Sequence, residues 1–231
     1  ANVDAINNFT VEFWFSAVNP HQIDSEATEG NSGTSGQKYA FGGAHGEWTW
    51  GSGGHAGVGI SIGTNGISIY EHSSNYMTPL LVFEDELIGM NHLTLTYENK
   101  QPKIYINGIL KKVGLISIKN FVHVGLHNEY GIGNIAGTQS YYEGFEGLLD
   151  EVKVWDYTKS ETEISNFWNL QIEGDEPGLI AYWMFNEGTG TTLTDVSDNG
   201  NDGTIYGDPE WVLNSYGCST EPDACNYEEG G

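Results

Sequence analysis

Glu146, Asp150 and Glu151 are three acids in the segment GFEGLLDEVKVWD, and carboxyl groups of this kind cleave glycosidic bonds. Enzymes that retain the anomeric configuration need two carboxyl groups about 5–5.5 Å apart, and enzymes that invert it need them about 6.5–9.5 Å apart. The segment alternates like a strand, so we expect the adjacent Asp150 and Glu151 to point to opposite faces. Glu146 would share the face of Asp150 at a distance of roughly 13 Å. The spacing therefore predicts no catalytic pair.

The same alternation predicts the surroundings of these acids. Asp150 would share a face with Leu148 and Val152 and be buried, held by backbone or hydroxyl donors. Glu151 and Lys153 would form a solvated ion pair on the other face. The chain has neither a Gly-x-Ser-x-Gly nor a His-Glu-x-x-His motif, and few basic residues that a lyase could use. We therefore expect no enzyme, with a glycoside hydrolase or lyase as an alternative.

Aromatic side chains in glycine-rich sequence form the first candidate binding site. In GGAHGEWTWGSGGHAG, Trp48 and Trp50 would share a strand face about 6.6 Å apart and could stack on a sugar. The alternative is that the pair packs over a sheet edge as core. The carbohydrate-binding candidates are His45, Trp48, Trp50, His55, Tyr76, Tyr141 and Tyr142. The tryptophans expected in the core or against a helix are Trp14, Trp155, Trp168 and Trp183.

A second candidate site is the loop DVSDNGNDG. Asp195, Ser197 and Asn199 match the opening D-x-S-x-N-G of a calcium loop and offer the oxygen ligands that this cation prefers. Position twelve of the loop is Tyr206 instead of Glu, and helices do not flank it, so the loop is no EF-hand. Asx and glycine turns alone would also explain this composition.

Composition limits the partners. The 231 residues carry eight Lys, no Arg and 32 acids, a formal net charge of −24, so nucleic acid and anionic membranes are poor partners. No apolar run approaches the roughly 20 residues that cross a bilayer, so we expect no membrane insertion. Cys218 and Cys225 are expected to form a local disulfide in an exported protein.

Alternating apolar residues predict many strands. In FTVEFWF, Phe9 and the residues at every second position after it would face the core. Asn65-Gly66 and Asn107-Gly108 predict type I′ hairpin turns. GLIAYWMFNE is apolar on both faces, which predicts a central strand. Residues 19–37 and 128–143 lack a strong pattern and are expected to be long surface loops.

One helix is expected near residues 160–170. Ser160 and Glu163 form a capping box, and Ile164, Phe167 and Trp168 would share a face. Many strands, one short helix and no alternation of strands with helices predict an all-β fold, an antiparallel two-sheet jelly-roll sandwich. We expect one domain over residues 1–216 and an acidic, Cys-containing tail over 217–231.

Three segments resemble laminin-G-like jelly rolls of the concanavalin A-like lectin and glucanase superfamily, a group that includes pentraxins. GFEGLLDEVKVWDYTKSETEISNFW resembles their closing strand and helix, and HLTLTYENKQPKIYINGIL resembles their paired strands with a YxNG hairpin. GLIAYWMFNEGTGTTLTDVSDNGNDGTIYG is similar to the segment that follows the helix in exported proteins of marine and gut bacteria. The tail YGCSTEPDACNY resembles the first of the Cys-bearing repeats of large secreted bacterial proteins.

The resemblance implies a calcium site. LHNEYGIGNIAGTQSYYEGFEG resembles the pentraxin segment that ligates calcium, which makes Asn128, Glu129 and Gln139 candidate ligands, with Glu47 from a second loop. Tyr130 stands where that family has a further acid, and a polar surface loop is the alternative. We expect a secreted or cell-surface module of an adhesion protein that binds glycans, with calcium as a possible cofactor and other cell-surface proteins as further partners. A protein–protein or spacer module is the alternative.

Overall fold

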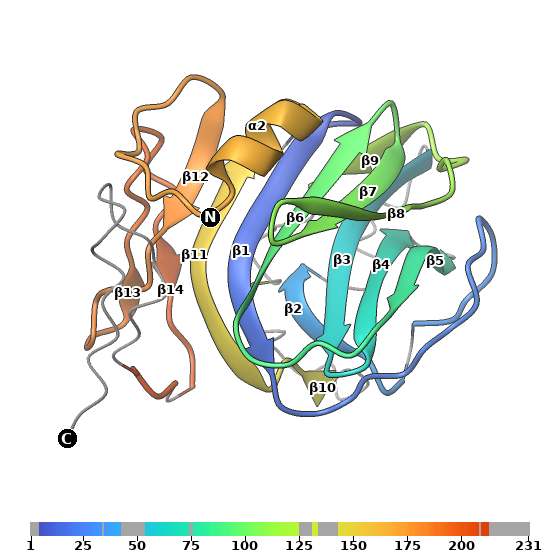
Figure 1. The fold of residues 1–231 in the computed structure, drawn as a ribbon, viewed down its shortest axis with the longest axis horizontal. Helices are drawn as coiled ribbons and strands as arrows, with labels where there is room; N and C mark the ends of the chain where they lie inside the picture. Colours follow the sequence, from blue (N-terminus) through green and yellow to red (C-terminus); the bar gives the residue numbers. More distant parts are fainter. Residues whose placement is uncertain are drawn as a thin grey trace.

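The structure is a computed structural model that describes residues 5–33, 35–42, 54–73, 76–124, 131–133, 143–207 and 209–212; for Tyr76 and Glu143 it describes the backbone alone. Two antiparallel sheets face each other and enclose one core, as Figure 1 shows. Among the described residues there is one short helix. The predicted antiparallel two-sheet sandwich is therefore confirmed, whereas the domain boundary at residue 216 lies outside the described residues.

The first sheet has six strands in the order β12-β11-β1-β6-β7-β8. Its strands are β1 (Phe9–Ala17), β6 (Asn91–Glu98), β7 (Gln101–Ile106), β8 (Ile109–Val113), β11 (Gly147–Trp155) and β12 (Leu179–Trp183). β1, near the middle, pairs antiparallel with both β11 and β6. Strands far apart in the sequence thus meet around β1.

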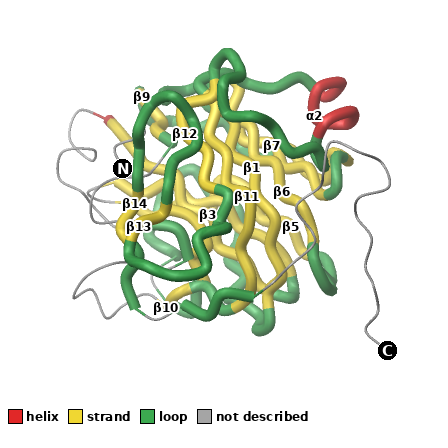
Figure 2. The backbone as a smooth tube through the Cα atoms, turned by 90° about the vertical axis from the view of Figure 1, so that its left-hand side faces the viewer, coloured by secondary structure: helices red, strands yellow, loops and turns green. Residues whose placement is uncertain are grey.

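The second sheet runs in the order β10-β2-β3-β4-β5, and β9 pairs in parallel with β3. Its strands are β2 (Lys38–Gly42), β3 (His55–Gly63), β4 (Gly66–Ser73), β5 (Tyr76–Glu84), β9 (Phe121–His123) and β10 (Glu143–Gly144). A further two-stranded sheet joins β13 (Thr192–Leu193) and β14 (Gly203–Thr204). Figure 2 shows β12 to β14 and their connecting loops on the near side of the sandwich.

The core lies between the two large sheets. Phe9, Val11, Phe13 and Phe15 are all buried there, as the alternation in β1 predicts. Each such side chain contributes about 1.5–3 kcal/mol when it is fully buried. The predicted core tryptophans Trp14, Trp155 and Trp183 are also buried, and Trp168 packs against Trp14 with ring centroids 5.4 Å apart.

The two Asn-Gly sequences form different turns. Asn107 and Gly108 both have positive φ, 51° and 76°, and Ile106 pairs with Ile109, so this turn is confirmed. In the other hairpin Gly63 pairs with Gly66, which makes Thr64 and Asn65 the turn residues, and the predicted turn at Asn65-Gly66 is wrong. The amide of Asn65 instead bonds the backbone N–H and carbonyl of His21, each at 3.0 Å.

Helix α2 (Glu161–Phe167) begins at the predicted capping box. The Ser160 hydroxyl accepts from the Glu163 N–H at 3.2 Å, and the Glu163 carboxylate accepts from the Ser160 N–H at 2.8 Å. Ile164 is buried, but Phe167 is 55% exposed, so the predicted shared face holds only in part. The helix ends after Phe167, and Trp168 continues towards Trp14 beyond it.

β12 is an edge strand, so its predicted central position is wrong. In the first sheet it pairs with β11 alone. Ala181 and Trp183 face the main core, whereas Leu179 and Tyr182 pack with Trp155 in a smaller apolar cluster on the other side. The strand is apolar on both faces because both of its faces are covered. No helix among the described residues is long and apolar enough to span a bilayer.

Candidate functional site

Most of the predicted binding residues fall outside the described part of the chain. These are His45, Glu47, Trp48, Trp50, Asn128, Glu129, Gln139, Tyr141 and Tyr142. Cys218 and Cys225 also lie outside it, and Tyr76 is described only as the first residue of β5. The structure does define where the segments that carry these residues leave and rejoin the sheet.

The ends of these segments converge on one edge of the second sheet. The N–H of Gly42, at the end of β2, donates to the carbonyl of Gly131 at 3.0 Å, and the N–H of Gly133 donates to the carbonyl of Ala40 at 2.8 Å. β10 pairs with β2 through Glu143 and Lys38. Segments 43–53, 125–130 and 134–142 are therefore all attached to the neighbouring strands β2, β3, β9 and β10.

A pair of histidines lies at this edge. His55 is the first residue of β3 and His123 the last of β9, and Nδ1 of His55 lies 2.5 Å from Nε2 of His123. The rings stack at 4.8 Å, and Phe121, which is 42% exposed, lies 4.6 Å from the His55 ring. One ring nitrogen donates to the other, and the tautomers of the two imidazoles decide which of them is the donor. His123 was not predicted, because only the parallel pairing of β3 with β9 brings it to His55.

The described residues of segment 19–37, which was predicted to be a surface loop, cover the outer face of the second sheet. The hydroxyl of Tyr70 donates to Asp24 at 2.8 Å, and that of Tyr39 donates to the Gly33 carbonyl at 3.1 Å. His21 is buried, with Nδ1 3.0 Å from the Ser61 hydroxyl. This face is thus filled by the protein itself, and the edge at β2, β3 and β9 is the better candidate site.

In the predicted calcium loop, the protein itself occupies the oxygens of Asp195. Oδ1 accepts from the N–H groups of Tyr182 and Ser197, both at 2.9 Å. Oδ2 accepts from the Ser197 hydroxyl at 2.9 Å and from the Asn201 N–H at 2.7 Å. The Asn199 amide donates to the Leu179 carbonyl at 3.0 Å. These bonds fasten the loop to β12, as the turn interpretation implies, and calcium binding here stays a prediction.

The acids of β11 are arranged by a bulge that the alternation did not predict. Glu12 of β1 pairs with Lys153 and Trp14 pairs with Asp150, so β11 has one extra residue between these pairs. Glu151 takes a positive φ of 55° there. Asp150 therefore lies on the outer face with Trp14, half-buried, and its predicted place on the face of Val152 is wrong. Burial, and then the charge of Glu151, raise the pKa of Asp150 to about 7.

Glu151 and Lys153 are buried, so the predicted solvated pair is wrong. Their side chains are each 4% exposed and form an ion pair of 3.1 Å, and the Tyr182 hydroxyl donates to Glu151. Glu146 is exposed and lies apart from them, and its ion pair of 2.6 Å with the buried Lys38 lowers the pKa of Glu146. Glu146 and Glu151 are thus each paired with a lysine, and the described residues show no free pair of carboxylates in this segment.

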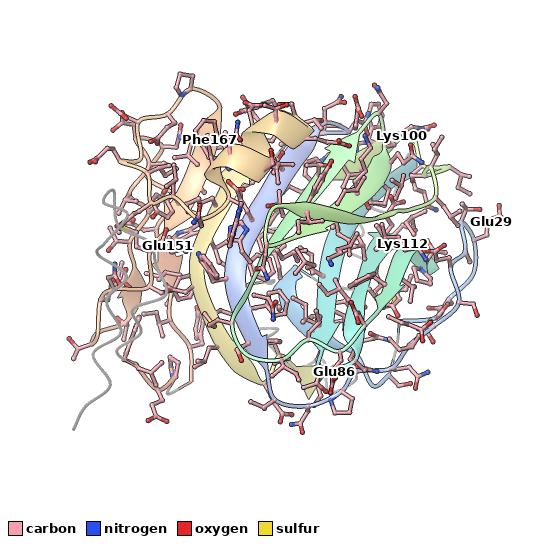
Figure 3. The ribbon with its side chains drawn as sticks, in the orientation of Figure 1. Glu29, Glu86, Lys100, Lys112, Glu151 and Phe167 are labelled. Carbon is pink, nitrogen blue, oxygen red and sulfur yellow. The ribbon has the colours of Figure 1, made fainter. Side chains whose placement is uncertain are left out.

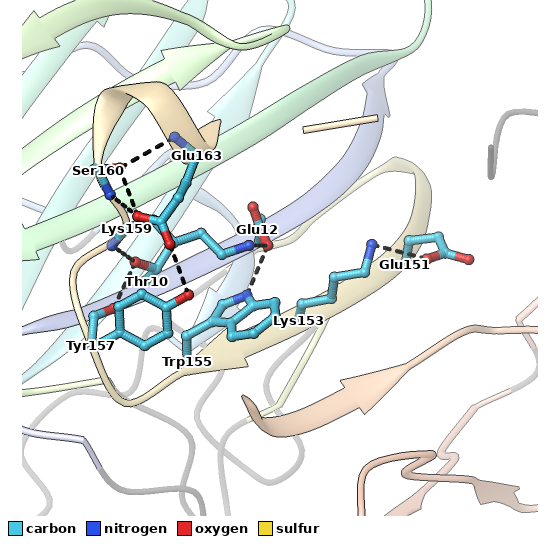
Figure 4. Close-up of polar contacts among 9 residues, drawn as sticks. All are labelled: Thr10, Glu12, Glu151, Lys153, Trp155, Tyr157, Lys159, Ser160 and Glu163. Atoms are coloured by element: carbon cyan, nitrogen blue, oxygen red, sulfur yellow. Dashed lines mark hydrogen bonds and ion pairs between the residues drawn. The ribbon is translucent and has the colours of Figure 1, made fainter. Parts of the chain in front are cut away.

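A polar layer beneath α2 joins β1 to β11, as Figure 4 shows. Glu12 is buried and accepts from the Trp155 indole at 2.7 Å and from the Lys159 ammonium. Burial alone would raise the pKa of Glu12, but the charge of Lys159 and, to a smaller extent, that of Lys153 lower it overall. Burial lowers the pKa of His92 to about 3, so this imidazole is neutral. The layer fixes the segment that leads into α2.

The sequence of this sandwich matches a known family over most of its length. Residues 1–165 match Laminin_G_3, described as the concanavalin A-like lectin/glucanases superfamily. The chain belongs to this family. None of the curated proteins compared with it matches.

Solved structures resemble this Laminin_G_3 chain in fold. A candidate carbohydrate-binding protein from Bacteroides ovatus has a TM-score of 0.53 and 20% identity over 86% of this chain and 51% of its own. The chain thus spans about half the length of that protein. A heptameric, SAP-like pentraxin from Limulus polyphemus has a TM-score of 0.45 and 14% identity over 71% of this chain and 70% of its own. At these identities the likeness concerns the fold alone.

Proposed function

We propose that the chain is a non-catalytic module that binds glycans at the edge formed by β2, β3, β9 and β10. The observation that carries this proposal is the convergence of segments 43–53, 125–130 and 134–142 on that edge. These segments carry Trp48, Trp50, Tyr141 and Tyr142, which suit stacking on sugar rings. Membership of a family of lectin-like and glucanase-like proteins supports the same function.

The described residues at this edge suit a sugar ligand. Phe121 offers an exposed ring, and the His55–His123 pair offers a polar group beside it. Pockets that bind small polar ligands combine apolar surface with a few fixed polar groups in the same way. We place His55, His123 and Phe121 at the base of the proposed site.

Binding without catalysis is favoured by the state of the acids. Glu12 and Glu151 are buried and paired with Lys159 and Lys153. A general acid and its partner carboxylate would have to reach the same glycosidic bond, which acids buried in ion pairs do not. Hydrolysis of a glycan is the second candidate function, because the pKa of Asp150 is raised to about 7, in the range suited to a general acid.

The proposal also covers calcium binding and the location of the protein. We propose that Asn128, Glu129, Gln139 and Glu47 bind calcium and hold the glycan site, and that the module is part of a secreted or cell-surface adhesion protein. A protein–protein or spacer module with no sugar site is the alternative.

A glycan array run with and without calcium tests these proposals. Trp48→Ala and Phe121→Ala should each weaken glycan retention by roughly tenfold or more, which corresponds to about 1.4 kcal/mol. Phe167→Ala is the matched control, because this exposed aromatic side chain lies on α2, away from the edge. Equal retention by all three variants would contradict the site, and release of a shortened glycan would favour the hydrolase.

The calcium proposal is tested by thermal unfolding. A chelator should lower the melting temperature and weaken retention, because a cation that binds the folded chain stabilises it. A melting temperature that does not change with chelator would contradict the calcium proposal but not the glycan site.

A further inference from the structure

The imidazoles of His55 and His123 face each other where β3 begins and β9 ends. Nδ1 of His55 lies 2.5 Å from Nε2 of His123, and the ring planes differ by 19°. One of these nitrogens carries the hydrogen atom of the bond, and the other offers a lone pair. A neutral imidazole is also the commonest metal ligand in proteins, through either ring nitrogen. The pair therefore brings together two groups of the type that bind metal ions.

The backbone that carries the pair is held on both sides of β9. On one side, β9 forms a parallel ladder with β3. On the other side, the Asn7 N–H donates to the Val122 carbonyl at 2.8 Å, and the Asn7 side-chain oxygen accepts from the Val122 N–H at 2.8 Å. Both histidines thus start from strand positions that need no ordering when a ligand binds, which lowers the entropic cost of binding.

The space in which the two rings meet lies above a glycine. In the ladder, Gly57 lies opposite His123, and since it has no side chain the ring of His55 reaches across it. His123 is 6% exposed, whereas His55 is half-buried beside the ring of Phe121, which is 42% exposed. A small ion can thus approach the pair from the side of His55, and the apolar ring beside it limits the access of water.

A tetrahedral zinc ion would need only a small opening of the pair. Zn–N bonds of about 2.0–2.1 Å at tetrahedral angles place two imidazole nitrogens roughly 3.3 Å apart. The rings must therefore tilt, and the distance of 2.5 Å must grow by less than about 1 Å. Each neutral imidazole keeps one hydrogen atom, so the donor ring moves its hydrogen to its other nitrogen and no proton is lost overall.

The ligand type selects the class of cation. Imidazole nitrogen suits Zn²⁺, Cu²⁺ and Ni²⁺, whereas Ca²⁺ and Mg²⁺ prefer oxygen ligands. In the part of the chain that the structure describes, no group of three or more His, Cys, Asp or Glu is placed to hold a metal ion. The two histidines would therefore supply two ligands, and water would fill the remaining positions.

The charge of the molecule favours the arrival of a cation. The formal net charge is −24, which raises the concentration of cations at the surface. Figure 3 shows Glu29, Glu86 and Glu151 at three separate parts of the sandwich. These carboxylates attract cations to the molecule as a whole but do not gather into one site.

We propose that His55 and His123 bind one zinc ion, through Nδ1 of His55 and Nε2 of His123. This site differs in ligand type from the proposed calcium ligands, and it does not depend on glycan binding. The ion would join the start of β3 to the end of β9 and keep open coordination positions on the side of the solvent.

Calorimetric titration of the full chain with zinc chloride, in the presence of excess calcium, tests this proposal. One zinc ion should bind to this site and resist displacement by calcium. His55→Gln and, independently, His123→Gln should each weaken zinc binding at least about tenfold. His92→Phe is the matched control, because it removes an imidazole from β6 of the other sheet, whose ring nitrogens have no hydrogen-bond partner among the described residues. This control should bind zinc as the wild type does.

Magnetic resonance of the histidine ring nitrogens identifies the ligands in the wild type, without any substitution. Zinc should shift the signals of Nδ1 of His55 and Nε2 of His123 and leave those of His92 unchanged. A wild type that does not bind zinc at about 1 mM would overturn the proposal. Unchanged affinity in both glutamine variants, zinc on other ring nitrogens of this pair, or displacement by calcium would also overturn it. Far-ultraviolet circular dichroism confirms that each variant is folded.

Discussion

Glu71 is a carboxylic acid that the fold buries between its two sheets. It is 1% exposed and accepts hydrogen bonds from the Ser117 hydroxyl and, at 3.3 Å, from the Tyr97 hydroxyl. Burial raises its pKa from 4.5 to about 7, although both hydroxyls and the more distant Lys119 and Lys100 oppose this shift. Near neutral pH the residue is therefore partly protonated, unlike the ionised and lysine-paired Glu12.

This pKa predicts that stability depends on pH. Between pH 4.5 and about 7 the folded chain keeps a proton on Glu71 that the unfolded chain loses, so the free energy of unfolding should fall as pH rises. Glu71→Gln should remove a decline on the order of 1–3 kcal/mol across this range. Denaturant unfolding of both proteins at pH 5 and pH 8 measures the difference. A variant with the same pH dependence as the wild type would contradict the assignment.

The β7–β8 hairpin and α2 meet at Gly108. This residue has a φ of 76°, and a Cβ atom built on it would lie 2.4 Å from Cδ1 of Trp168. Trp168 in turn packs on Trp14, so the turn, the helix end and the central strand depend on one another. Glycine is needed at this turn for its backbone angle and for the close approach of the indole.

Replacement of this glycine separates the two requirements. Gly108→Ala should lower the free energy of unfolding by roughly 1–3 kcal/mol more than Gly200→Ala. Gly200 has a similar φ of 66° but no atom within 4 Å of a built Cβ, so it reports the backbone strain alone. Equal losses in the two variants, measured by denaturant unfolding, would show that Trp168 moves away without cost.

The elements also show which features a sequence can predict. Alternation in β1 and the capping box of α2 depend on neighbouring residues, and both are confirmed. The bulge at Glu151 has no local mark, because a glutamate with positive φ is rare and only the pairing with β1 requires it. That bulge changed the face of Asp150, whereas Glu151 and Lys153 are buried because Tyr182 of β12 covers them.

The candidate site was predictable in part. The glycine-rich and aromatic composition identified segment 43–53, but its residues lie outside the described part. His123 could not be predicted, because parallel pairing of β3 with β9 is a contact between distant segments. The edge position of β12 was not predicted, for a related reason. An apolar pattern indicates that a face of the strand is covered, but it does not show which part of the chain covers it.

At the scale of the whole molecule, the folded unit extends past the family match. The match ends at residue 165, whereas β12 lies at Leu179–Trp183 and the loop at Asp195 is fastened to it. β12 covers the buried ion pair of Glu151 and Lys153 through the hydroxyl and ring of Tyr182. Residues after 165 therefore complete the sheet.

Truncated chains should show whether the folded unit ends at residue 165 or extends further. A chain ending at residue 216 should unfold with the cooperativity and melting temperature of the full chain. A chain ending at residue 165 should lose cooperative unfolding, because it would expose the buried ion pair and one side of β11. Calorimetry of the two fragments measures this. A cooperative melt of the shorter fragment would show that β12 is dispensable.

The directions of the strands also determine how this sheet carries mechanical load. β11 is antiparallel to both β1 and β12, so β1 and β12 run in the same direction on either side of it. A pull at the start of β1 and at the end of β12 acts along the strands and towards opposite ends of the sheet. Because ladder hydrogen bonds lie perpendicular to the strands, such a force shears both ladders at once instead of opening them one bond at a time. This part of the sheet should therefore resist a pull between these two points.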